Sequence, residues 1–142
     1  MNVWFHYEGI SNKIPFSKKH IKLWIMQIAK SEKVIFGEIN YIFCSDEFLL
    51  NLNLKYLNHD TLTDIITFDN SDNSNKITGD VFISIERVNE NASNLNIDFK
   101  SELLRVMSHG ILHLCGYKDK NSNDKLIMKQ KEDAAIALFT IV

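Results

Sequence analysis

The first half of the chain alternates short apolar runs with segments of helical spacing. Val3–Tyr7 is an apolar and aromatic run that predicts a strand. From Ser17 to Ser31, apolar residues recur every three or four positions, which predicts a helix with Ser17 as its N-cap. Ile39–Cys44 is typical of a buried strand, and Ser45 is placed to cap the next helix. A β-α-β order of this kind favours a parallel strand pair.

The second half predicts two more strands and then helices. Asp64–Phe68 is rich in β-branched residues and predicts a strand that Thr63 and Asp64 cap, while Gly79–Ile85 predicts another. The short polar loop between these strands favours an antiparallel hairpin. Three helices are then expected, at Glu86 to Leu95, at Asp98 to Cys115, and from Ser122 or Asn123 to Phe139. The pattern predicts an α+β fold, in which one domain of residues 1–142 has a small mixed sheet of about four strands packed with about five helices.

Composition agrees with this prediction and removes several alternatives. The chain has 142 residues, of which 45% are hydrophobic and 24% are charged, as in ordinary globular proteins. A chain of this length buries a full core without disulfides. One proline and five glycines argue against a many-turned β-sandwich or barrel. Disordered, collagen-like and coiled-coil proteins are excluded by the same balance.

Charge and cysteine content indicate the cellular compartment but do not identify the substrate. The net charge of −2 and the pI of about 6.2 do not mark a nucleic-acid binder, although a basic groove can occur on a neutral protein. Two cysteines, Cys44 and Cys115, cannot form a disulfide framework. The sequence has no signal-peptide pattern and no apolar stretch long enough to span a bilayer. We therefore expect a reducing, cytoplasmic setting without membrane contact.

The segment HGILHLCGYKD, from His109 to Asp119, carries the clearest candidate chemistry. His109 and His113 are four residues apart, so on a helix both imidazoles reach one ion. Gly116 ends the helix and turns the chain back, which allows Asp119 to approach the same point. Two histidines and a carboxylate with one open position are the ligands of a catalytic zinc site. We therefore predict a zincin-like metal helix that binds one ion.

The spacing alone leaves an ordinary explanation open. Two histidines four residues apart on a helix are often coincidental surface or core residues. The other histidines, His6, His20 and His59, form no ligand pattern and are expected at the surface. Cys115 points away from His113 around the helix and is expected to pack in the core.

Zinc peptidases share part of this pattern. Their H-E-x-x-H signature places a glutamate, the general base, directly after the first histidine. Here that position is Gly110, so the usual proton shuttle of peptide hydrolysis is missing. A peptidase is therefore the weakest of the functions considered.

Three motifs together resemble the YbeY family of rRNA maturation factors, which are regarded as metal-dependent endoribonucleases. They are HGILHLCGYKD, LNLKYLNHDTLTDIITF at Leu52–Phe68, and GDVFIS at Gly79–Ser84. The resemblance implies a zinc-dependent hydrolase that cleaves single-stranded RNA and processes the 3′ end of small-subunit rRNA. It also implies precursor rRNA and the small ribosomal subunit as partners. Zinc is the expected cofactor, and another divalent transition metal also suits these ligands.

Two positions depart from the family pattern. Asp119 stands where the family usually has a third histidine, and its charge should favour harder ions and make bound water less acidic. Leu57 stands where the family usually has an arginine thought to face the substrate. Arg105, one turn before His109, is a candidate to replace it as a catalytic residue, as are Lys55 and His59. Because no general base is evident, a non-catalytic ribosome-assembly factor with a structural metal site is the main alternative function.

Overall fold

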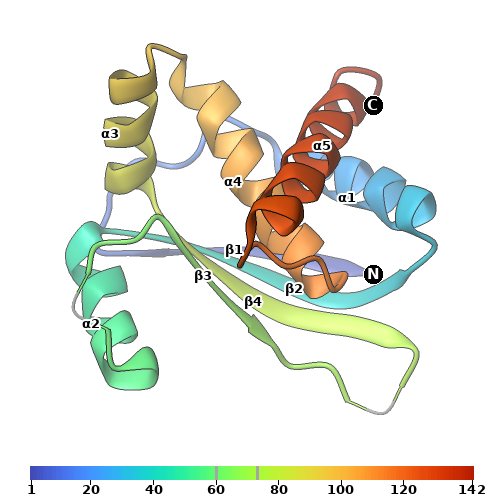
Figure 1. Cartoon of the computed structure of the whole chain (residues 1–142), viewed down its shortest axis with the longest axis horizontal. Helices are drawn as coiled ribbons and strands as arrows, with labels where there is room; N and C mark the ends of the chain where they lie inside the picture. Colours follow the sequence, from blue (N-terminus) through green and yellow to red (C-terminus); the bar gives the residue numbers. More distant parts are fainter. Residues whose placement is uncertain (60, 73) are drawn as a thin grey trace.

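Four strands form a single mixed sheet with the order β1-β2-β4-β3 (Figure 1). The computed structural model describes residues 1–59, 61–72 and 74–142. The strands are β1 (Asn2–Glu8), β2 (Ile35–Cys44), β3 (Ile65–Asp69) and β4 (Lys76–Ser84). β1 and β4 both run parallel to β2, and β3 pairs antiparallel with β4. The predicted parallel pair and the predicted hairpin are both confirmed.

Five helices complete the described fold, which confirms the α+β prediction. They are α1 (Lys18–Glu32), α2 (Asp46–Leu57), α3 (Ile85–Leu95), α4 (Phe99–Leu114) and α5 (Ser122–Phe139). The predicted N-caps Ser17 and Ser45 accept hydrogen bonds from the backbone N–H three residues on, and Asp98 does the same for α4. In the described part of the chain, no helix combines the length and apolar character that crossing a membrane requires.

All four strands differ from the predicted bounds by one to four residues, and two of these differences, in β4 and β2, have identifiable reasons. β4 ends at Ser84 because the Ser84 hydroxyl accepts a hydrogen bond from the Arg87 N–H and caps α3, so Ile85 is helical. β2 begins at Ile35 rather than Ile39 because its first residues pair with the start of β4, before a register shift between Phe36 and Ile39. A bulge of this kind interrupts the alternation by which strands are recognised in a sequence.

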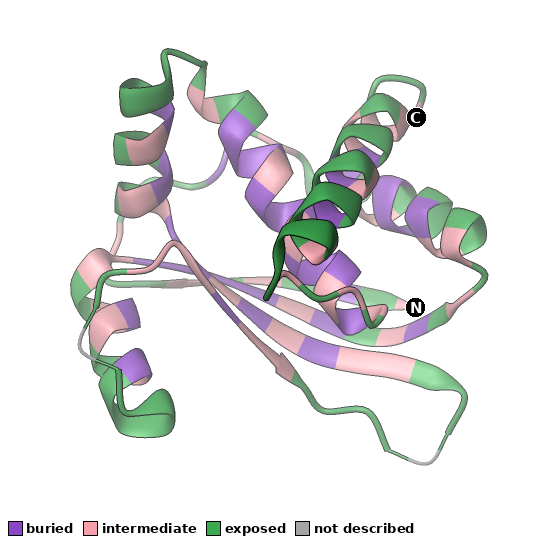
Figure 2. Cartoon of the chain, in the orientation of Figure 1, coloured by how far each residue is buried: buried purple, intermediate pink, exposed green. Residues whose placement is uncertain are grey.

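The main core lies between the sheet and the helices α1, α4 and α5 on one face, while α2 covers part of the other face (Figure 1). Buried positions run along α4 and the central strands (Figure 2). The indole N–H of Trp24 donates to the Ala135 carbonyl at 2.7 Å, and the Tyr41 hydroxyl donates to the Met107 carbonyl at 3.1 Å. These bonds satisfy the polar atoms of two of the largest core side chains, and they tie α1 to α5 and β2 to α4.

Gly110 lies where α4 crosses the sheet at close range. A Cβ atom at this position would lie 2.6 Å from Cγ1 of Val81 on β4 and 3.0 Å from Cδ1 of Ile65 on β3. A side chain here would force Val81 or Ile65 to move, so the glutamate of a zinc peptidase does not fit without rearrangement. The structure therefore gives a packing reason for the glycine and a second argument against a peptidase.

We expect Gly110→Ala to lower the free energy of unfolding by about 1–3 kcal/mol, because the added methyl group overpacks the helix–sheet contact. The gain in helix propensity of about 1 kcal/mol opposes this loss only in part. Urea unfolding measures the difference. Ser93→Ala, at an exposed position of α3, is the control and should change stability little. Unchanged or increased stability of Gly110→Ala would contradict the close contact.

Candidate metal centre

His109, His113 and Asp119 converge at the C-terminal end of α4, as the spacing predicts. The two histidines lie one turn apart on α4, and Asp119 lies in the loop that leads to α5. Oδ2 of Asp119 is 3.3 Å from Nε2 of His109 and 3.4 Å from Nε2 of His113. One ligand atom from each residue lies within 4.8 Å of the others, so the three form a group that can bind a metal ion.

The other ring nitrogen of each histidine is held by a partner. Nδ1 of His109 lies 2.6 Å from Oε2 of Glu132 on α5, and Nδ1 of His113 lies 2.8 Å from the carbonyl oxygen of Tyr117. With Nδ1–H donating to these oxygens, both Nε2 lone pairs point to the position where Asp119 converges. Metal-binding histidines are typically oriented in this way. The residues present therefore fit a divalent transition metal.

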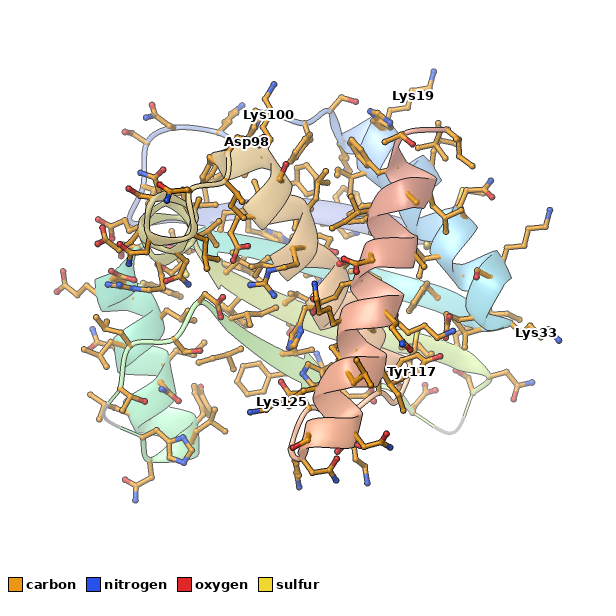
Figure 3. All side chains as sticks on the ribbon, turned by 45° about the horizontal axis from the view of Figure 1, so that its top comes forward. Lys19, Lys33, Asp98, Lys100, Tyr117 and Lys125 are labelled. Atoms are coloured by element: carbon orange, nitrogen blue, oxygen red, sulfur yellow. The ribbon has the colours of Figure 1, made fainter. Side chains whose placement is uncertain are left out.

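The loop that carries Asp119 is anchored at its start, by Gly116 and Tyr117. Gly116 adopts a φ of 107°, in the left-handed region, and its N–H donates to the His113 carbonyl at 2.9 Å. The Tyr117 hydroxyl donates to the Glu32 carboxylate at the end of α1, and Lys131 of α5 lies 3.1 Å from the same carboxylate. Figure 3 shows Tyr117 beside α5, on the side of α1. The turn and these bonds hold the loop against two helices.

Arg105 links the metal centre to a buried carboxylate. Its guanidinium makes two hydrogen bonds with Glu102, of 2.8 and 2.6 Å, and the Glu102 side chain is completely buried. Another of its nitrogens lies 3.5 Å from Glu132, and Asp64 lies 3.9 Å away. The hydrogen bonds with Glu102 raise the pKa of Arg105 above its usual range. Three carboxylates therefore already surround the charge of Arg105.

Glu102 and Glu132 were not identified from the sequence. Glu132 lies 23 residues beyond His109 on another helix, and no motif spacing connects the two. Glu132 is only 5% exposed, and a buried glutamate on a helix looks like a surface residue in the sequence. Asp64, expected only as a strand cap, also faces the site. Burial raises the pKa of Asp64, although the nearby Arg105 opposes this shift.

We expect Glu132→Gln to weaken zinc binding by about 10- to 100-fold, because an amide supports the His109 imidazole less well than a carboxylate. Competition with a colorimetric zinc chelator measures the affinity. Asp133→Asn is the matched control, since the neighbouring Asp133 side chain is 67% exposed and its only ion pair among the described residues is with Lys129. Equal affinities of the two variants would show that Glu132 does not support a metal ligand.

A cavity of about 650 Å³ opens beside the three convergent residues. Its walls come from the end of α2, from β3 and the segment before it, and from α4. Arg105 and His59 both line this cavity, and so do Leu57 and Thr67. Lys55 does not line it, because its ammonium lies over the ring of Tyr56 at 5.3 Å from the centroid. Asp60, which the second motif contains, lies outside the described residues.

The remaining histidines and Cys115 are separate from the site. His6 is exposed, as predicted, and its Nε2 lies 3.0 Å from the Asn40 side-chain oxygen. His20 is half-buried rather than on the surface, because its ring stacks on Phe139 at 4.2 Å between centroids. Cys115 packs against the main core, which confirms its predicted place.

Comparison with known proteins identifies relatives along nearly the whole chain. A sequence model of the family described as Endoribonuclease YbeY matches residues 6–140. The Endoribonuclease YbeY of Flavobacterium johnsoniae is 54% identical over 140 residues and 96% of each chain. That of Cytophaga hutchinsonii is 54% identical over 121 residues and 85% of each chain.

A solved structure agrees with this assignment. A solution structure of a Thermotoga maritima protein matches with a TM-score of 0.64 and 29% identity, over 95% of this chain and 88% of that one. The sequence match, the shared fold and the convergent metal-binding group all point to the same family. The chain belongs to the endoribonuclease YbeY family.

Proposed function

We propose that this protein is a metal-dependent endoribonuclease, a hydrolase that takes part in rRNA maturation. The observation that carries the proposal is the convergence of three ligand atoms at the wall of a cavity of about 650 Å³, in a chain of this family. His109, His113 and Asp119 would hold one zinc ion. When bound there, such an ion lowers the pKa of water and polarises a phosphate oxygen. Because the described residues offer three ligands beside the cavity, a bound ion would have a further position available for water, as in catalytic zinc sites.

The protein's own groups orient this centre. Glu132 and the Tyr117 carbonyl fix the imidazole rings, and the turn at Gly116 places Asp119. Arg105 acts in this proposal as a positioning residue, because it holds Glu132 while its charge is balanced by carboxylates. His59 lies in the cavity wall, where it can contact a nucleotide, and Lys55 lies outside that wall. Among the three catalytic candidates, we therefore retain only His59 as a substrate contact.

The finer proposals concern the substrate and the cellular setting. We propose single-stranded precursor rRNA as the substrate, at the 3′ end of the small-subunit rRNA, with the small ribosomal subunit as the partner. These proposals are supported by membership of the endoribonuclease YbeY family. We also propose that residues 1–142 form the catalytic domain and act in the cytoplasm. Two free thiols, Cys44 and Cys115, agree with a reducing compartment.

RNA cleavage by chelated and zinc-reconstituted protein tests the activity. We expect the reconstituted protein to cleave a single-stranded RNA and to spare the same sequence in a duplex. The chelated protein and the reconstituted His113→Ala variant should both be inactive. Cleavage that persists at full rate in the chelated protein would contradict metal dependence, and equal cleavage of duplex would contradict the strand preference.

The assembly-factor alternative has one structural argument in its favour. Leu57 contributes no charge to the cavity wall, so substrate binding there is weaker than an arginine would make it. If the metal is only structural, removing it should lower the free energy of unfolding while zinc-loaded protein still fails to cleave RNA. Metal-dependent turnover, with a fold retained after chelation, would exclude this alternative.

A further inference from the structure

A second cavity meets the first at the metal centre. It has a volume of about 360 Å³, and Arg105, His109 and Asp119 line both cavities. The side not shared with the first cavity comes from α5, where Lys125 and Lys129 lie in the wall. The metal centre therefore lies at the junction of two hollows.

The two hollows differ in the cations that they offer. The larger cavity has Asp64, Asp69 and Asp119 in its wall, and its arginine is already surrounded by carboxylates. No lysine of the described residues lines it. Counting side chains alone, this wall is net negative, whereas the three carboxylates of the smaller cavity, Asp119, Glu132 and Asp133, are matched by Arg105, Lys125 and Lys129. Positive charge on the side of α5 therefore adds to that of a bound metal ion in attracting RNA to the junction.

The lysines of the smaller cavity are available to an anion. Lys125 and Lys129 are four residues apart, so their side chains share one face of α5. Among the described residues, no carboxylate lies within 4.0 Å of the Lys125 ammonium. Lys129 lies 3.9 Å from Asp133, but both side chains are well exposed, at 74% and 67%, and such pairs are weak in water. A phosphate can therefore replace Asp133 as the partner of Lys129.

We propose that Lys125 and Lys129 form a subsite for a backbone phosphate of the RNA, next to the phosphate held at the metal centre. The inference rests on the proposed endoribonuclease function and adds the path of the substrate. In this arrangement the strand runs from the larger cavity across the metal centre to the first half of α5. The contact is to the backbone and is independent of base sequence.

The salt dependence of RNA binding tests the subsite. We compare the zinc-loaded wild type with a double variant, Lys125→Gln with Lys129→Gln, using a short fluorescent single-stranded RNA whose integrity is checked on a gel. Losing two phosphate contacts should reduce the slope of log affinity against log salt by about 1.4. Between about 50 and 200 mM salt, the wild-type affinity should then fall about sevenfold further than that of the variant.

A second double variant controls for net charge. Lys19 and Lys100 are exposed and line neither cavity, and Figure 3 shows them at the opposite side of the molecule from Lys125. Changing both to glutamine removes the same charge and should leave the slope close to that of the wild type. Equal slopes for the two double variants, with RNA still bound and cleaved, would overturn the subsite alone. A wild type that neither binds nor cleaves RNA would overturn the proposed function and the subsite with it.

Single methylphosphonates, which replace one charged phosphate at a time, then locate the contact. One substitution beside the cleaved position should weaken wild-type binding and have no further effect on the Lys125→Gln, Lys129→Gln variant. Such non-additivity is expected when both changes remove the same contact. Fully additive losses at every position would contradict a phosphate subsite on α5.

Discussion

His113→Ala should reduce the zinc content of the purified protein from about one equivalent to almost none. The substitution removes one of three convergent ligands, so affinity should fall by more than the roughly 100-fold expected for a supporting residue. Elemental analysis after dialysis against a weak chelator measures the loss. Because His113 lies near the surface at the end of α4, the variant should keep the circular dichroism spectrum of the wild type. Full retention of zinc would show that these residues are not the site.

Asp119 permits a finer test of the same centre. Asp119→Ala should lose zinc as His113→Ala does, whereas Asp119→His should retain it, since imidazole is also a zinc ligand. Asp124→Asn removes a nearby charge outside the convergent group and is the control. If Asp119→Ala binds zinc as tightly as the wild type, Asp119 is only a loop residue after Gly116, and its 3.3 Å approach to His109 has no role in binding.

The metal-binding group could be predicted because its geometry is almost entirely local. Two histidines on consecutive helical turns and a glycine that reverses the chain fix the arrangement within eleven residues. The partners of these ligands could not be predicted in the same way. Glu132 reaches His109 only because α5 packs back across α4, and the sequence contains no spacing that encodes this contact.

The roles of the three catalytic candidates also depend on tertiary contacts that the sequence does not show. Arg105 was correctly placed on the face of His109, but the sequence could not show that Glu102, one turn earlier, is buried and binds it. Lys55 and His59 flank Leu57 in the sequence, yet the end of α2 directs only His59 to the cavity, because Lys55 lies over Tyr56. Position in a motif predicts which segment lies near a site. Side-chain direction at a helix end depends on the tertiary structure.

The boundaries of the sheet illustrate a third kind of difference. The hydrophobic pattern located each strand, but the early residues of β2 are recognisable only by their pairing with β4. Gly110, by contrast, could be interpreted from the sequence, and the structure then supplied the physical reason for it. Its presence made a peptidase the weakest function considered from the sequence, and the 2.6 Å approach of Val81 explains why a larger residue there forces its neighbours to shift.

Arg105→Met should destabilise the protein by about 3 kcal/mol, because it leaves the Glu102 carboxylate buried without its partner. The value lies at the lower end of the range for buried pairs, since the Arg105 side chain is itself 37% exposed and water screens part of the interaction. Urea unfolding of the zinc-free proteins measures the loss without a contribution from the metal. Adding Glu102→Leu to Arg105→Met should restore part of the stability, because the buried charge is then removed.

Arg87→Met is the matched control for this experiment. Arg87 pairs with Asp46 at 2.8 Å, but both side chains are 25% exposed, so we expect a loss of about 1 kcal/mol or less. A positioning role for Arg105 predicts that the variant, at temperatures where it is folded, binds zinc less tightly through the loosened Glu132. A substrate-binding role instead predicts normal stability and zinc affinity with a raised KM for RNA. Because these outcomes differ in measurements made without RNA, they separate the structural function of Arg105 from the catalytic one that its place on α4 first indicated.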